Sequence, residues 1–191
     1  MMKNWMMVVA GSLLFTHLSV RAEETATAVR NGFTLEAGLG GSFVSEIHSS
    51  EDSSNRLGRD ALSVGLGGFV TPSLALLVRF SQTSFKPASA HGTTSDVSSL
   101  WFLGAHVQYW LTDRFFVSGG PGYVHFDHVF AAVYGAELHE QYQNLGFSIR
   151  TGFAFGLWEN HTLRISLEAI PAFFERTTIM GEALSLEWQW F

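Results

Sequence analysis

The chain has 191 residues, of which 47% are hydrophobic and 15% are charged, and it contains no cysteine. Typical soluble domains carry about 25% charged residues, so this composition argues against both a disordered chain and an ordinary soluble globule. The 17 acidic residues outnumber the 11 lysines and arginines, which argues against a general nucleic-acid binder, because such proteins present a basic surface to phosphates. Without cysteine the chain has no disulfide, thiolate metal ligand or cysteine nucleophile.

Residues 1–22 predict a secretory signal peptide. Lys3 precedes an apolar run from Trp5 to Phe15, and Ala22 ends the segment before two glutamates. The run is shorter than the roughly 20 residues that a transmembrane helix needs, which favours a cleaved leader over a membrane anchor. Residues 23–32 are polar and predict a flexible periplasmic lead-in to the domain formed by residues 33–191.

From residue 33 onward, apolar and polar residues alternate with a period of two, which is the pattern of a strand with two different faces. Phe147 and Ile149, for example, alternate with Ser148 and Arg150. Similar runs predict eight strands near residues 33–43, 62–70, 74–83, 101–109, 114–126, 145–157, 163–169 and 184–190. Pro121 falls inside the fifth run and Pro171 in the continuation of the seventh strand, and both predict bulges, because proline cannot donate to a strand ladder.

Short and longer connections alternate along the chain. Short links fall at 71–73, 112–113 and 159–161, and longer polar links occupy about 46–60, 86–97, 127–142 and 176–181. Short turns at one rim and longer loops at the other are typical of outer-membrane barrels. The sequence therefore predicts an all-β protein, an eight-stranded antiparallel up-and-down transmembrane β-barrel preceded by a cleaved signal peptide, with both mature termini in the periplasm.

The contents of the two faces indicate which one meets lipid. A soluble lipocalin-like barrel would carry a dense mixture of charges and lysines on its outer face, but Lys86 is the one lysine after residue 22. The polar face instead holds small residues and charges that balance, which suits the narrow interior of an eight-stranded barrel. The predicted interior charge network comprises Glu36, Arg79, Arg150, Arg164, Glu168 and Glu187, and the sequence leaves its pairing open.

Aromatic residues gather near the predicted strand ends. Rings with an apolar body and a polar edge prefer membrane interfaces, where they form girdles around a barrel. The predicted membrane-interface aromatics of the periplasmic side are Tyr109, Trp110, Phe115, Trp158, Trp188, Trp190 and Phe191.

The leader, the eight alternating strands, the short turns and the terminal segment Glu187–Phe191 resemble the small bacterial outer-membrane β-barrels of the OmpX and OmpA transmembrane-domain type. The resemblance implies a place in the outer membrane, contact with its lipids and lipopolysaccharide, and recognition of the C-terminal strand by the barrel-assembly machinery. Phe191 lies one step outside the alternation that ends at Trp190, which predicts a frayed end or bulge. We expect a monomer.

Chemistry-bearing residues cluster around the third long link. His125, Asp127 and His128 lie close in sequence, and His139 and Glu140 follow across the link. They match no template of metal-ligand spacing, so we expect no metal site. Lipid A deacylases of the PagL type are barrels of similar size, but Phe126 follows His125 where their His-x-Ser-Asn motif would continue.

These observations predict a non-enzymatic outer-membrane barrel that needs no cofactor. Its predicted extracellular loops at residues 46–60 and 86–97 are polar and rich in Ser, Asp and Gly, which suits an envelope-structural role or surface adhesion and binding. A lipid A deacylase-like enzyme and a soluble lipocalin-like ligand carrier remain the alternatives.

Overall fold

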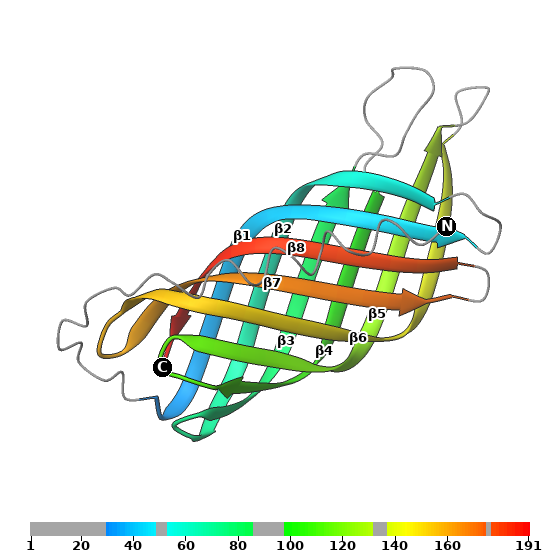
Figure 1. Cartoon of the computed structure of the whole chain (residues 1–191). Helices are drawn as coiled ribbons and strands as arrows, with labels where there is room; N and C mark the ends of the chain where they lie inside the picture. The colour runs from blue at the N-terminus through cyan, green and yellow to red at the C-terminus, as the bar shows by residue number, and fades with distance from the viewer. Residues whose placement is uncertain (1–29, 49–52, 86–97, 132–136, 175–176) are drawn as a thin grey trace, which may run out of the picture.

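The computed structural model describes residues 30–48, 53–85, 98–131, 137–174 and 177–191, so the predicted signal peptide lies outside the described residues. Each strand pairs antiparallel with the next one in sequence, and β8 pairs with β1 to close a barrel (Figure 1). The prediction of an eight-stranded antiparallel barrel is confirmed. The strands are β1 (Gly32–His48), β2 (Ser53–Thr71), β3 (Leu74–Phe85), β4 (Ser98–Trp110), β5 (Phe115–Ala131), β6 (Glu137–Leu157), β7 (His161–Phe173) and β8 (Thr177–Trp190).

The apolar face of each strand points out of the barrel. Leu39 and Leu145 are 68% and 77% exposed, whereas Glu36 and Arg150, on the opposite face of the same strands, are buried. A soluble barrel would show the reverse, with large apolar residues inside and charges outside. The outer band of Leu, Val, Ile and Phe is suited to lipid, and this excludes the lipocalin-like alternative. No helix in the described part of the chain is long and apolar enough to cross a membrane.

The short links lie together at one rim of the barrel. They connect β2 to β3, β4 to β5 and β6 to β7, and β1 begins and β8 ends at the same rim (Figure 1). Leu35 of β1 lies opposite Trp190 of β8 at this end of the closing pair. Because short turns mark the periplasmic side of such barrels, we refer to this rim as the periplasmic mouth.

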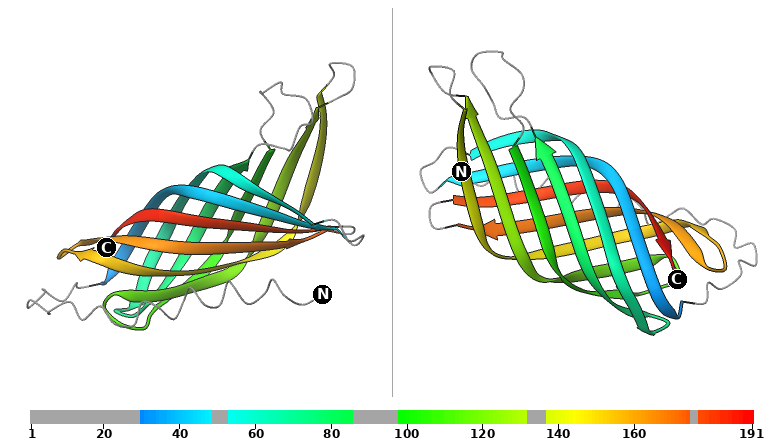
Figure 2. Two further views of the ribbon diagram at one scale, coloured as in Figure 1. Left: turned by 45° about the horizontal axis from the view of Figure 1, so that its top comes forward. Right: turned by 180° about the vertical axis from the view of Figure 1, so that it is seen from behind.

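Two of the expected long loops are largely strand. Residues 46–48 and 53–60 belong to β1 and β2, and residues 127–131 and 137–142 belong to β5 and β6. Strand β6 has 21 residues, although about 9 to 11 suffice to cross a bilayer. The hairpin of β5 and β6 therefore rises beyond the rest of the rim (Figures 1 and 2). Above the membrane both faces of a hairpin meet water, so alternation of apolar residues no longer marks the strand.

The prediction of bulges at the two strand prolines is wrong. Pro121 lies opposite Phe147 and Pro171 opposite Met180, with no register shift at either position. A proline removes one ladder hydrogen bond on one side of its strand, and this does not require an extra residue. The register shifts fall instead between Gly40 and Phe43, Gly58 and Asp60, Phe69 and Thr71, and Ala154 and Gly156.

Candidate functional site

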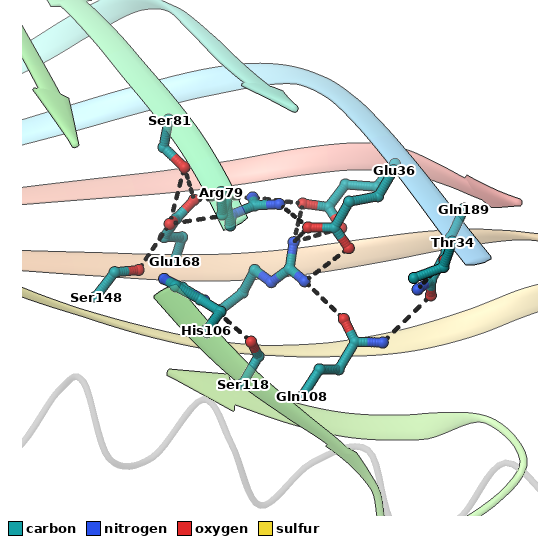
Figure 3. A network of polar contacts seen from close by, with 12 residues as sticks. Thr34, Glu36, Arg79, Ser81, His106, Gln108, Ser118, Ser148, Glu168 and Gln189 are labelled. Carbon is teal, nitrogen blue, oxygen red and sulfur yellow. Dashed lines mark hydrogen bonds and ion pairs between the residues drawn. The ribbon is translucent and has the colours of Figure 1, made fainter. Parts of the chain in front are cut away.

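A network of charged side chains fills the middle of the barrel (Figure 3). Alternation turns one residue in two inward, and the register then sets which inward residues are neighbours. Arg150 lies directly opposite Glu168 across β6 and β7, and Arg164 lies opposite Glu187 across β7 and β8. The structure brings all six residues of the expected network together in the interior, where each is at least nine-tenths buried.

Glu36 and Glu187 are each held by all three arginines. Nη1 of Arg150 lies 3.0 Å from Oε1 of Glu36 and 3.0 Å from Oε1 of Glu187. Nε of Arg164 lies 2.7 Å from Oε2 of Glu187, and its Nη2 pairs with Glu36. Arg79 pairs with Glu36 and places Nη2 3.0 Å from Oε1 of Glu187. Three positive and three negative charges cancel, which makes burial of the cluster tolerable, because an unpaired buried charge is costly.

Glu168 joins the network from its extracellular side. Its Oε2 lies 3.0 Å from Nη2 of Arg79. The hydroxyls of Ser81 and Ser148 donate to its Oε1 over 3.0 and 2.7 Å. These donors satisfy a carboxylate whose side chain is only 4% exposed.

Neutral side chains extend the network toward the periplasmic mouth. Gln108 accepts from Nη2 of Arg150 over 2.9 Å and donates to Gln189 over 3.3 Å. Gln189 in turn donates to Thr34 over 3.0 Å. His106 Nδ1 lies 3.1 Å from the hydroxyl of Ser118. Sequence reasoning placed His106 in the interior but did not single out Thr34, Gln108 or Gln189, although each lies on the same alternating face as the charges.

Apolar layers cover the network at both ends. The extracellular layer comes from the strand ends that carry the loops, and its buried members are Val44, Phe85, Leu100, Phe102, Val124, Phe126, Ile170, Ala172 and Ile179. The periplasmic layer comprises Trp110, Phe116 and Ala154, with Phe69 and Leu157 packed against them. Guanidinium groups stay protonated in proteins, and the three arginines here hold the three carboxylates between them.

Comparison with solved structures identifies this architecture. The attachment invasion locus protein Ail of Yersinia pestis, in complex with the heparin analogue sucrose octasulfate, is similar over 83% of this chain and 99% of its own, with a TM-score of 0.60 and 11% identity. Neisserial surface protein A matches 83% of this chain and 96% of its own, with a TM-score of 0.57 and 15% identity. No protein-family model matches the sequence, and no curated protein is similar enough in sequence to match.

The chain has the fold of the small bacterial outer-membrane β-barrels. The expectation of the OmpX and OmpA type is thereby confirmed at the level of the fold. The structural neighbours are bacterial outer-membrane proteins, and the outer apolar band of this barrel matches that location.

Five of the expected interface aromatics lie on the outer face of this outer-membrane barrel. The rings of Tyr109, Phe115, Trp158, Trp188 and Trp190 are exposed at the periplasmic ends of their strands. Trp158 stacks on His161 with ring centroids 4.7 Å apart. That these five rings form an interface girdle, as in other membrane barrels, stays a prediction.

Trp110 and Phe191 depart from that expectation, because both side chains are buried inside the barrel. Trp110 is separated from His106 and Gln108 by even numbers of residues along β4. Side chains at such spacings share one face of a strand, so the alternation already indicated that Trp110 faces the interior. Phe191 directly follows the last ladder pair of β8, which joins His161 and Trp190. Its side chain packs against Phe69 with centroids 5.9 Å apart, and its backbone N–H donates to the carbonyl oxygen of Asn160. The expected fraying or bulge at Phe191 is therefore wrong.

His125 lies on the outer wall near the extracellular end of β5. Its ring stacks on Trp101 with centroids 4.9 Å apart, and its Nδ1 has no hydrogen-bond partner in the described part of the chain. Asp127 is two residues further along the same strand. The side chains of His128, His139 and Glu140 lie outside the described ones. Among the described residues, no three His, Asp or Glu side chains come together as a metal site would require.

Proposed function

We propose that this protein is a closed, non-conducting outer-membrane barrel that acts through its extracellular surface and catalyses no reaction. The observation that carries the proposal is the filled interior. The Arg and Glu network occupies the centre, and apolar layers close it toward both rims. An eight-stranded barrel encloses only enough room for side chains. The filled interior therefore leaves no channel through which a solute could pass.

The extracellular side offers the surface on which such a protein can act. The hairpin of β5 and β6 projects beyond the membrane-spanning part, and residues 137–145 of β6 pair with β5 but not with β7. This gives a two-stranded platform that extends past the neighbouring strands. A role in surface adhesion, binding or maintenance of the envelope fits that platform. Ail, which shares the fold, has been solved in complex with the sulfated sugar sucrose octasulfate. Only the shared fold supports the proposal.

We further propose the partners that this location supplies. Outer-membrane lipids and lipopolysaccharide contact the apolar wall and its aromatic girdle. The barrel-assembly machinery recognises the C-terminal segment, in which Trp188 and Trp190 of β8 are followed by Phe191. The closed ladder leaves no strand edge free within the membrane, which supports a monomer.

A hairpin deletion tests the surface role directly. His128 lies opposite Glu140 in the β5 and β6 ladder, so replacing residues 129–139 by Asn-Gly closes the hairpin with a two-residue turn and leaves the barrel intact. We expect cells with this variant to lose adhesion to matrix-coated surfaces, or to become sensitive to detergent, while the purified barrel keeps its thermal stability. Unchanged adhesion and unchanged detergent resistance, relative to cells with the intact protein, would refute a role for this surface.

The position of His125 beside the outer leaflet makes lipid modification the second candidate. Mass spectrometry of lipid A from cells with and without the protein separates the two functions. We expect the same acyl pattern in both. A changed pattern that His125→Ala abolishes would replace the non-enzymatic proposal with a lipid-modifying enzyme.

A further inference from the structure

Arg30 lies in the lead-in, two residues before β1, yet its side chain is only 5% exposed. The lead-in is polar in sequence, and Arg30 belongs to no strand. Gly32, at the start of β1, has a φ of 68°, a left-handed conformation that glycine adopts easily and that turns the chain sharply. Residues 30 and 31 therefore do not continue the direction of β1.

The Arg30 side chain reaches the far side of the periplasmic mouth. Its Nη2 donates a hydrogen bond to the backbone carbonyl oxygen of Asp113, and its Nη1 lies 3.9 Å from the Asp113 carboxylate. Its guanidinium carbon lies 3.8 Å from the centre of the Trp110 ring. Asp113 sits in the turn between β4 and β5, and β5 is four strands from β1 in both directions around the closed sheet. The contact thus joins opposite walls.

Two aromatic rings separate Arg30 from the charge network. Trp110 packs against Phe116 with ring centroids 5.2 Å apart. On its other side, Phe116 lies beneath the guanidinium groups of Arg164 and Arg150, at 4.4 and 5.0 Å from its centroid. Arg30 and the two rings together form a stack that runs from the mouth to the buried charges.

The contacts of Arg30 must offset the cost of burying its charge. Burial lowers the pKa of the Arg30 guanidinium, and the nearby Asp113 carboxylate acts in the opposite direction. The Asp113 side chain is 71% exposed and the pair is long, so the ion pair itself is weak. The stacking on Trp110 and the hydrogen bond to the Asp113 backbone therefore hold the side chain in place.

We propose that Arg30 is a strap that holds the periplasmic mouth shut, so that water and solutes reach the charge network only when the strap is released. The strap fastens Arg30, two residues before β1, to the turn between β4 and β5. It works independently of any role of the extracellular surface.

A single engineered thiol tests the strap. The chain has no cysteine, so Ser166→Cys introduces the only thiol. Ser166 faces the interior, is buried, and its hydroxyl makes no hydrogen bond within the described residues, which makes the substitution mild. The measurement is the rate at which a charged, water-soluble methanethiosulfonate modifies this thiol in the mature chain, refolded into lipid vesicles or detergent micelles.

Adding Arg30→Ala should accelerate modification by about tenfold or more. Without Arg30, the mouth can open locally at a lower cost in free energy, because no contacts of Arg30 have to be broken first. Arg30→Lys should lie between the two, since lysine keeps the charge but lacks the planar group that stacks on Trp110. Asp113→Ala should change the rate little, because the carbonyl acceptor remains. Arg114→Ala, which removes an arginine from the same turn, is the matched control and should leave the rate unchanged.

A backbone variant covers the case in which Arg30→Ala does not fold. A Cβ on Gly32 would meet no atom within 4 Å, so Gly32→Ala acts through the left-handed backbone alone and should also accelerate modification. Gly41, whose Cβ would likewise meet nothing but whose φ is not positive, supplies the control Gly41→Ala. Modification at the parent rate in a folded Arg30→Ala or Gly32→Ala protein would overturn the strap.

Discussion

Replacing Arg150 by methionine tests whether the interior network stabilises the barrel. The Arg150 side chain is fully buried, and its Nη atoms lie within 3.1 Å of both Glu36 and Glu187 and 2.9 Å from Gln108. Methionine fills much of the same volume but supplies no charge. The variant therefore leaves two arginines facing three carboxylates inside the barrel.

The expected loss of unfolding free energy depends on which carboxylates Arg79 and Arg164 still contact in the variant. Removing one partner of a buried ion pair typically costs about 3 to 5 kcal/mol. Glu36 and Glu187 each retain Arg79 and Arg164, so we expect the lower end, about 3 kcal/mol. With a urea dependence of about 1 to 3 kcal/mol per molar, the unfolding midpoint should fall by about 1 to 3 M.

Equilibrium urea unfolding in lipid vesicles, followed by tryptophan fluorescence, measures this midpoint. The double variant Arg150→Met with Glu187→Gln restores equal numbers of charges and should recover part of the loss. Arg114→Met, in the turn between β4 and β5, makes the same exchange outside the network and should leave the midpoint unchanged. An unchanged midpoint for Arg150→Met, or strictly additive losses in the double variant, would refute the electrostatic argument.

Three further outcomes are expected. The protein should show no steady ion conductance in planar bilayers, whereas a stable open level would contradict the filled interior. Gly38→Ala should lower the free energy of unfolding by about 1 to 3 kcal/mol, because its Cβ would lie 2.7 Å from Cγ of Glu187, while Gly41→Ala should not. Leu167→Lys, in the middle of the outer wall, should cost about 2 to 4 kcal/mol and Val70→Lys, near the periplasmic rim, about 0 to 1. Equal costs for the two lysines would argue against this placement in the bilayer.

Alternation predicted the barrel because it reports a local property. In a strand, side chains point to opposite sides in turn, so the lipid-facing Leu and Phe residues and the inward Ser, Arg and Glu residues separate within each strand. The same rule placed Trp110 beside His106 and Gln108 on the inner face. The expectation that Trp110 lies at the membrane interface relied on its being aromatic. Its position in the alternation of β4 indicated the interior instead, and in the structure the side chain is inside.

Alternation stops being informative where both faces of a strand meet the same solvent. The projecting parts of β5 and β6 lie above the lipid, so their polar sequence resembles a loop although the backbone ladder continues from Ala131 to Glu137 across the hairpin. Register is also invisible in a single strand. Pro121 lacks a ladder pair toward β4 and Pro171 toward β6, but the register is the same on both sides of each gap, so neither proline causes a shift.

By itself the sequence determined the eight strands, their inner and outer faces, and the charged residues that turn inward, since each of these depends on neighbours along the chain. Only the tertiary structure decided which charges meet. Arg150 reaches Glu36 from β6 to β1, and Arg30 reaches Asp113 from the lead-in to the turn between β4 and β5. These contacts cross the interior of a closed barrel, and their partners are set by register and closure, which no single strand encodes.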